Sequence, residues 1–241
     1  MNPIFAALPM AFFQDMGHEF YQSLIESNRY EYILIGLENT LILTVFAVLI
    51  GVLLGTIVAL VKVAHVGKPK KLRIANGICT LYLTIIRGTP VVVQLMIMYY
   101  VILTSADKMV AATLAFGINS GAYVAEVIRS GILSVDHGQI EAGRSLGLSQ
   151  RTTMFKIVFP QALKNVLPAI GNEFIALLKE TSVAGYIGVQ DLTKGGDIIR
   201  SITYLAFTPL LTTALVYLVI VIGLTALLTK FERRLRRSDN R

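Results

Sequence analysis

Residues 41–61 read LILTVFAVLIGVLLGTIVALV and contain no charged side chain. A helix of this length rises about 30 Å, which matches the hydrocarbon thickness of a bilayer, so the stretch predicts a membrane-spanning helix. Small residues recur along it at every fourth position, at Ala47, Gly51, Gly55 and Ala59. Such a stripe favours the close approach of a second helix, although ordinary small-residue content explains it about as well.

The composition of the whole chain agrees with that of a membrane protein. Hydrophobic residues make up 54% of the 241 residues, charged residues make up 15%, and the mean hydropathy is +0.66. Soluble domains of this length rarely have that balance. The net charge of +7 does not indicate nucleic-acid binding, because the Lys and Arg residues flank apolar stretches instead of forming a basic face with interleaved aromatics. The single cysteine, Cys79, excludes an internal disulfide and a multi-cysteine metal cluster.

Further apolar stretches predict an all-α polytopic bundle of about five transmembrane helices. The second stretch, residues 74–103, contains RGTP at residues 87–90, where Pro90 removes a backbone donor and disfavours helix at Thr89. We expect one broken span there, and two shorter segments are the alternative. The other predicted spans are residues 109–128, residues 162–185 with interruptions at Pro168 and Gly171, and residues 203–229.

The distribution of basic residues predicts the orientation of the bundle. Of the 22 Lys and Arg residues, five lie in the loop after the first span, five lie between residues 129 and 164, and six lie from residue 230 onward. The positive-inside rule places these segments in the cytoplasm and the N-terminus outside. We therefore expect an external or interfacial segment at residues 1–30, a transmembrane domain at 31–229 and a basic cytoplasmic tail at 230–241.

The loop at about residues 136–160 predicts a compact pair of short helices. Its residues 140–146, IEAGRSL, favour a helix that Gly147 ends, and residues 150–159, QRTTMFKIVF, favour a second helix that ends before Pro160. Glu141, Ala142, Gly147 and Pro160 at this spacing resemble the EAA-type loop of ABC importer permeases, whose short helix docks on a cytoplasmic ATPase.

The resemblance implies that Glu141, Ala142, Gly147 and Leu148 couple the chain to such an ATPase. The loop departs from the family at Gly143, where a second alanine is more common, and glycine weakens a helix by up to about 1 kcal/mol. A connecting hairpin without any partner is the alternative.

Four other segments are similar to the permeases of polar-amino-acid ABC importers of the histidine, glutamine and arginine type. They read GLENTLILT at 36–44, IIRGTPVVVQL at 85–95, NSGAYVAEVIRSGI at 119–132 and GNEFIALLKETS at 171–182. The resemblance implies a type I importer fold, a bacterial cytoplasmic membrane location, a second permease subunit, two cytoplasmic ATPases and an extracytoplasmic substrate-binding protein. ATP and Mg²⁺ would belong to the partner ATPase, and the chain itself has no GxxxxGK[ST] phosphate loop.

Two acidic residues within the predicted fourth span are candidates for binding substrate. Glu173 and Glu180 are seven residues apart, so on a helix both point from one face and lie about 10 Å apart along it. Charged groups at membrane depth need a partner or water, and these two would suit a cationic amino acid such as arginine, lysine or histidine. Internal ion pairs with Lys179 or Arg87 are the alternative, and neutral polar amino acids remain open. Gln94 is a third candidate, for which hydrogen bonding within the core is the alternative.

No catalytic or metal site is predicted. His18, His65 and His137 lie far apart in the sequence, and none has the spacing of a metal-binding motif. The sequence thus predicts a transport subunit that is not itself an enzyme. An ATP-independent secondary transporter or channel is one alternative function, and a membrane scaffold without transport activity is another.

Overall fold

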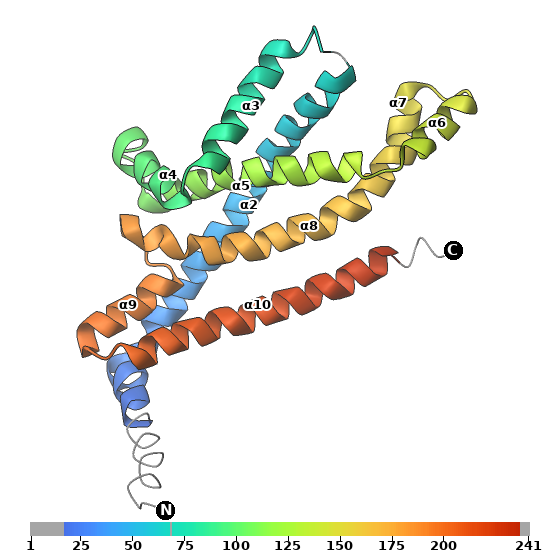
Figure 1. Ribbon diagram of the computed structural model, residues 1–241. Helices are drawn as coiled ribbons and strands as arrows, with labels where there is room; N and C mark the ends of the chain where they lie inside the picture. The colour runs from blue at the N-terminus through green and yellow to red at the C-terminus, as the bar shows by residue number, and fades with distance from the viewer. Residues whose placement is uncertain (1–16, 68, 237–241) are drawn as a thin grey trace, which may run out of the picture.

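The computed structural model describes residues 17–67 and 69–236, and every regular element within these ranges is helical (Figure 1). The predicted all-α fold is thereby confirmed. Residues 1–16 of the predicted external segment and residues 237–241 of the predicted tail lie outside the described ranges. In chain order, the elements are η1 (Tyr21–Ile25), η2 (Glu26–Asn28), α2 (Tyr30–Gly67), α3 (Arg73–Gly88), α4 (Val91–Ile97), η3 (Met98–Ile102), α5 (Lys108–Leu133), α6 (His137–Ser145), α7 (Gln150–Thr153), η4 (Met154–Val158), α8 (Phe159–Glu180), η5 (Thr181–Ile187), α9 (Leu192–Thr203) and α10 (Phe207–Arg236).

The stripe of small residues on α2 is the contact surface with α5. The two alanines of the stripe are fully buried. A Cβ atom on Gly51 would lie 2.7 Å from Ser120 Oγ, and one on Gly55 would lie 2.8 Å from the carbonyl oxygen of Gly121. Side chains do not pack at such distances, so the close approach predicted from the stripe is confirmed. Helix α2 also extends beyond the predicted span at both ends, since no proline interrupts the helix in the flanking residues.

The second apolar stretch is broken at RGTP, as predicted. Helices α3 and α4 meet at an angle of 109°, which fits both the predicted broken span and the alternative of two shorter segments. Thr89 takes an extended conformation and Pro90 is the N-cap of α4, which agrees with the preference of the residue before proline for extended backbone. In Figure 1, α4 turns sharply away from the end of α3.

The sequence predicted two helix ends that the structure does not have. The helix that begins at Gln150 passes through α7 and the π-helical turn η4 into α8, so it does not end before Pro160. Pro160 falls in the first turn of α8, where a missing N–H is tolerated. Pro168 does not interrupt α8 either: the helix continues through it and packs against α5 and α10. Gly171 contributes packing instead of a break, since a Cβ there would overlap Leu228 of α10.

Three helices of the described ranges are long and apolar enough to cross a membrane, namely α2, α5 and α10, and the number is four if the bent pair of α3 with α4 and η3 is one span. Helix α8 is more polar, because Lys164, Glu173, Lys179 and Glu180 lie on it. It nevertheless runs beside α10 and α5 (Figure 1). The count of five spans and their orientation therefore stay predictions.

Hydrogen bonds join α9 and the segment before it to the start of α2. Asn39 Nδ2 donates to the Gln190 carbonyl at 2.9 Å, and the backbone N–H of Leu192 donates to Thr40 Oγ1 at 3.0 Å. In Figure 1, α9 and the start of α10 lie at the end of the molecule nearest the N-terminus, whereas α6 and the end of α10 lie at the opposite end. The predicted ATPase-coupling loop is thus at the same end as the basic tail.

Candidate functional site

Helix α8 carries the two acids that the sequence singled out, and they face the same side. Glu173 is half-buried and accepts a hydrogen bond from Ser120 Oγ at 3.3 Å, while Glu180 is exposed. Within residues 17–67 and 69–236, neither acid forms an ion pair with any Lys, Arg or His. The ion pairs with Lys179 or Arg87 that the sequence left open are not formed in these ranges. Substrate binding by the two acids remains a prediction.

Gln94 lies beside the break between α3 and α4 and bonds to it. Its Nε2 donates to the Ile86 carbonyl at 2.8 Å, to the Thr89 carbonyl at 3.0 Å and to Thr89 Oγ1 at 2.8 Å. Its Oε1 accepts from Asn119 Nδ2 at 3.0 Å. These bonds satisfy backbone groups that the break releases, so the alternative of hydrogen bonding within the core accounts for Gln94. Any contact of Gln94 with substrate is untested.

Asn119 and Ser120 connect the break to the acids, and sequence reasoning had not assigned them to the site. Asn119 bonds Gln94 and Ser120 bonds Glu173, and both α5 side chains are almost completely buried. Two adjacent polar side chains in an otherwise apolar span were the available signal. The hydrogen bonds of these two side chains join the RGTP break and Glu173 to the same turn of α5.

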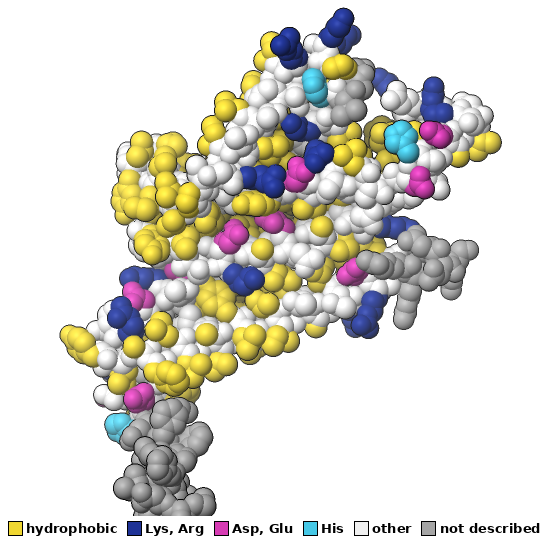
Figure 2. Space-filling view, in the orientation of Figure 1, with side chains coloured by type: hydrophobic (Ala, Val, Ile, Leu, Met, Phe, Trp, Pro, Cys, Tyr) yellow, Lys and Arg dark blue, Asp and Glu magenta, His cyan; other side chains and the backbone are white. Residues whose placement is uncertain are grey.

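A second group of charges, from α2, α3 and α5, lies further along α5, toward its C-terminal end. Arg129 forms an ion pair with Glu126, whose charge also interacts with Arg87 and Lys62. The Arg87 guanidinium lies 5.8 Å from the centre of the Tyr123 ring. Figure 2 shows acidic and basic side chains gathered close together near the centre of one face of the molecule.

The predicted coupling loop forms a helix with a defined C-terminal cap. The Asp136 carboxylate caps α6, and Gly147 has a φ of +82°. The N–H of Gly147 donates to the Arg144 carbonyl at 3.0 Å, and the N–H of Leu148 donates to the Gly143 carbonyl at 3.1 Å. This pair of bonds is a Schellman cap, for which glycine at the positive-φ position is the preferred residue. The cap sets the direction in which the chain leaves α6.

The exposed side of α6 includes Glu141 and Ala142, whereas Leu148 is half-buried. Leu146, which sequence reasoning did not select, is 82% exposed. Gly143 is buried on the other side, where a Cβ would lie 2.8 Å from Ile157 Cδ1 and 3.1 Å from Thr153 Cγ2. The departure from alanine at this position thus lets α6 pack closely on η4.

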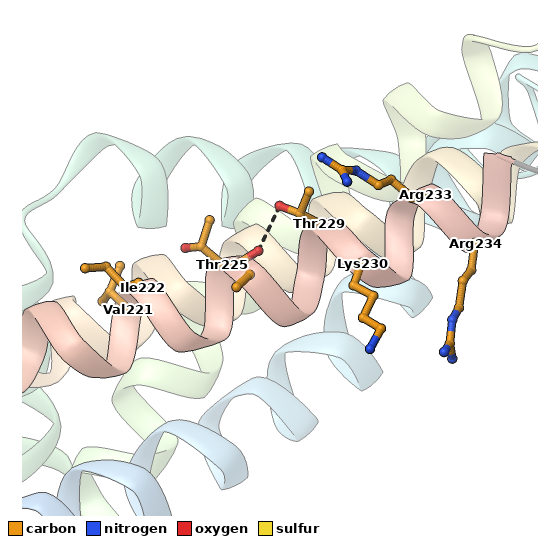
Figure 3. Close-up of a pocket in the computed structure, with 8 residues that line it drawn as sticks. Val221, Ile222, Thr225, Thr229, Lys230, Arg233 and Arg234 are labelled. Atoms are coloured by element: carbon orange, nitrogen blue, oxygen red, sulfur yellow. Dashed lines mark hydrogen bonds between the residues drawn. The ribbon is translucent and has the colours of Figure 1, made fainter.

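A groove of about 840 Å³ lies along the C-terminal half of α10, away from the acids (Figure 3). Along α10 toward its C-terminus, the lining changes from apolar and hydroxyl side chains to basic ones. The same change is typical of a helix that leaves a bilayer on the cytoplasmic side. The lining residues are Val221, Ile222, Thr225, Ala226, Thr229, Lys230, Arg233 and Arg234.

A third polar region surrounds the start of α9, outside the membrane-spanning helices. Asp191 is fully buried and caps α9 through the N–H of Thr193 at 2.9 Å. Burial raises the pKa of the Asp191 carboxyl from 3.8 to about 6, although the N–H groups of Thr193 and Lys194 oppose the shift. Lys194 and Arg200 hold the pKa of the half-buried Asp197 carboxyl below its ordinary value. No three His, Cys, Asp or Glu side chains come together as a metal site within residues 17–67 and 69–236.

Comparison with known proteins gives a consistent result over most of the chain. A family described as "Binding-protein-dependent transport system inner membrane component" matches residues 51–237. The arginine transport system permease protein ArtQ of Bacillus subtilis is 37% identical over 86% of this chain and 94% of its own length. The putative glutamine transport system permease protein GlnP of Rickettsia bellii is 38% identical over 84% of this chain and 94% of its own length.

Solved structures agree with the sequence comparisons. One chain of an amino acid ABC transporter crystallised with histidines is 42% identical, covers 88% of this chain and 97% of its own length, and superposes with a TM-score of 0.80. A chain of the MetNI methionine ABC transporter, in an inward-facing conformation, is 20% identical with a TM-score of 0.67 and shares the fold. The type I importer permease fold expected from the resemblance is confirmed.

Proposed function

This chain belongs to the family of binding-protein-dependent transport system inner membrane components, and from that premise we propose that it is the translocation subunit of an ATP-driven importer of polar amino acids. Relatives named as arginine and glutamine permeases, similar over more than four-fifths of the chain, support this class of substrate. The proposal includes a second permease subunit, two cytoplasmic ATPases that bind ATP and Mg²⁺, and an extracytoplasmic binding protein. Two chains of this kind would form one pathway and alternate between inward-facing and outward-facing states.

The observation that carries the proposal is the pair of acids on α8. Neither Glu173 nor Glu180 has an ion-pair partner within the described ranges, and Glu173 is joined to the bundle by Ser120. An ionised carboxylate at membrane depth needs a cation or water. A substrate guanidinium or ammonium supplies that cation, so we expect a preference for arginine, lysine or protonated histidine.

The coupling step is proposed for α6. Its exposed Leu146, with Glu141 and Ala142, offers an apolar contact with a polar edge to a groove on the ATPase. The helical path from Gln150 to Glu180 contains no loop. We therefore expect a displacement of α6 to be transmitted along α8 to both acids. Gly147 and Leu148 contribute indirectly, because their N–H groups form the C-terminal cap that sets the direction of α6.

Neutral substrates are a second candidate because two kinds of relatives differ in their named substrate. GlnP of Escherichia coli, named for glutamine, is 38% identical over 168 residues. A single glutamate can bind the α-ammonium that every amino acid carries. An ATP-independent transporter and a scaffold fit less well, because the family is one of binding-protein-dependent transport.

Uptake by the assembled importer in liposomes tests the proposal. We expect Glu173→Gln and Glu180→Gln each to reduce arginine uptake roughly tenfold or more relative to glutamine uptake, through loss of a charge-assisted contact. Glu31→Gln, which removes an exposed acid at the start of α2, is the matched control and should change neither. Unchanged arginine selectivity in both site variants would remove the acids from the substrate site. Uptake without ATPase would instead establish a secondary transporter, and no uptake under any condition would favour a scaffold.

A further inference from the structure

Helix α10 exposes most of its apolar surface, unlike the other long helices of the bundle. Of an apolar stretch of 18 residues in α10, only 6% is buried within the chain, whereas 39% is buried in the corresponding stretch of α2 and 61% in that of α5. The Ile222 side chain is 59% exposed and that of Leu227 is 66% exposed. Apolar surface of this extent marks a contact with lipid or with another protein. Something outside this chain therefore covers α10.

The groove along the C-terminal half of α10 begins with an apolar part of defined length. This part extends from Val221 to Thr229, which is eight residues or about 12 Å along the helix axis. The hydrocarbon of one leaflet is roughly 15 Å thick, so the two lengths are similar. The Thr229 hydroxyl donates to the Thr225 carbonyl at 2.8 Å (Figure 3), and this hydroxyl therefore needs no water in the groove. The apolar part of the groove fits a lipid acyl chain.

Three exposed cations, Lys230, Arg233 and Arg234, line the other end of the groove. None of the three forms an ion pair within residues 17–67 and 69–236. Lys230 and Arg234 are four residues apart and point to the same side of α10 in Figure 3, so both can act on one anion. The sequence of α10 contains one acid, Glu232, so the end of the helix keeps an excess of positive charge.

We propose that this groove is a binding site for an anionic phospholipid, in which Lys230 and Arg234 hold the phosphate and the apolar part holds an acyl chain. Guanidinium and ammonium groups form strong charge-assisted hydrogen bonds with phosphate. Cations directly beyond the end of a membrane-spanning helix attract anionic lipids in particular, because a zwitterionic lipid carries no net charge. The site is independent of the amino acid that the chain transports, so it does not rest on the proposed function.

Protein partners fit this groove less well than a lipid does. In a two-fold contact the same patch lies on both subunits, so a second copy of this chain would bring its own unpaired cations against these. Like charges placed together oppose association. A cytoplasmic ATPase could meet the cations, but the apolar part belongs to a helix long and apolar enough to cross the membrane, where a soluble protein does not reach.

The experiment compares an anionic lipid with a zwitterionic one. The full chain, purified in a neutral detergent, is titrated with palmitoyl-oleoyl phosphatidylglycerol and with the matching phosphatidylcholine, and native mass spectrometry measures the bound lipid. We expect Lys230→Gln with Arg234→Gln to weaken phosphatidylglycerol binding roughly twentyfold, about fivefold per charge, and to leave phosphatidylcholine binding within about twofold. Lys70→Gln with Lys71→Gln removes the same charge from an exposed loop and should leave both affinities unchanged.

A second variant tests the apolar part without changing any charge. Ala226 is exposed and lines the groove, so Ala226→Trp fills it and should weaken phosphatidylglycerol binding at least about fivefold. Three results would each overturn the proposal: equal affinity of wild type for the two lipids, equal losses in the two double variants, or an Ala226→Trp variant that binds as wild type does. If the double variant does not accumulate, Arg234→Gln alone decides, with an expected loss of about fivefold.

Thiol labelling in the assembled importer tests whether a protein covers the groove instead. Thr229→Cys places a thiol in the groove, and wild type serves as the blank because its one cysteine, Cys79, is buried. In detergent without added lipid, a maleimide should label the new thiol readily, and added phosphatidylglycerol should slow the labelling severalfold. Protection of the thiol before any lipid is added would show that a second copy or an ATPase occupies the groove, and would overturn the proposal.

Discussion

Replacing Gly147 tests whether the cap of α6 positions the coupling helix. The φ of Gly147 is +82°, and a Cβ built there meets nothing within 4 Å, so a side chain is opposed by backbone strain alone. The left-handed conformation costs an ordinary residue about 1–2 kcal/mol, more for a β-branched one and little for asparagine. We therefore expect the capped state to be depopulated about fivefold in Gly147→Ala and roughly thirtyfold in Gly147→Val, with Gly147→Asn close to wild type.

The measurement is the amount of ATPase that co-purifies with each variant from membranes, together with the ATPase activity of the complex. Retention should follow the order Gly, Asn, Ala, Val if the cap sets the direction of α6. Far-ultraviolet circular dichroism of each purified variant checks that the bundle still folds. Wild-type amounts of ATPase on Gly147→Val, or equal losses in Asn and Val, would refute the reasoning, because neither result follows from backbone strain at this position.

Two further substitutions test the packing and the outer region. Gly51→Ala should lower the thermal stability of the purified chain by the equivalent of about 1–3 kcal/mol, since the new Cβ would press on Ser120. Gly77→Ala is the control: Gly77 has open space around it, so this change should leave stability unchanged or raise it slightly. Equal effects of the two alanines would contradict the close contact of α2 with α5. Because the folded pKa of Asp191 is raised from 3.8 to about 6, its contribution to stability is present below about pH 4 and is lost as pH rises through 6, at most roughly 3 kcal/mol. Asp191→Asn keeps a capping side chain, so the melting temperature of this variant should rise relative to that of wild type between about pH 5 and pH 7.5. Parallel pH profiles of the two melting temperatures would show that the carboxyl does not titrate in this range.

Local sequence predicted the break in the second stretch but mispredicted the path of α8, although both contain proline. At Pro90 the residue before it is extended, and Gln94 supplies hydrogen bonds to the released backbone, all within a few positions. At Pro168 no such local signal exists, and α8 runs on while packed against α5 and α10, which are distant in sequence. Whether a proline breaks a helix thus depended on tertiary packing that the local pattern does not contain.

The site was predictable where it depended on helical spacing. The common face of Glu173 and Glu180 follows from seven residues on one helix. The connection of Glu173 to Ser120 joins residues far apart in sequence, and so does the bond from Asn119 to Gln94. Such pairs depend on how α5 crosses its neighbours. The exposure of Leu146 likewise depends on which side of α6 packs against η4.

The uninterrupted helix from Gln150 to Glu180 makes the rotational register of the site depend on its length. Each residue of an α-helix adds about 100° of rotation and 1.5 Å of rise. One inserted or deleted residue between α6 and Glu173 would therefore change the direction of the Glu173 carboxylate, which bonds Ser120, relative to α6, even with every side chain retained. In relatives that share this architecture, changes of length should be confined to the segments on either side of this helix, and the residue count within it should be as constrained as the acids themselves.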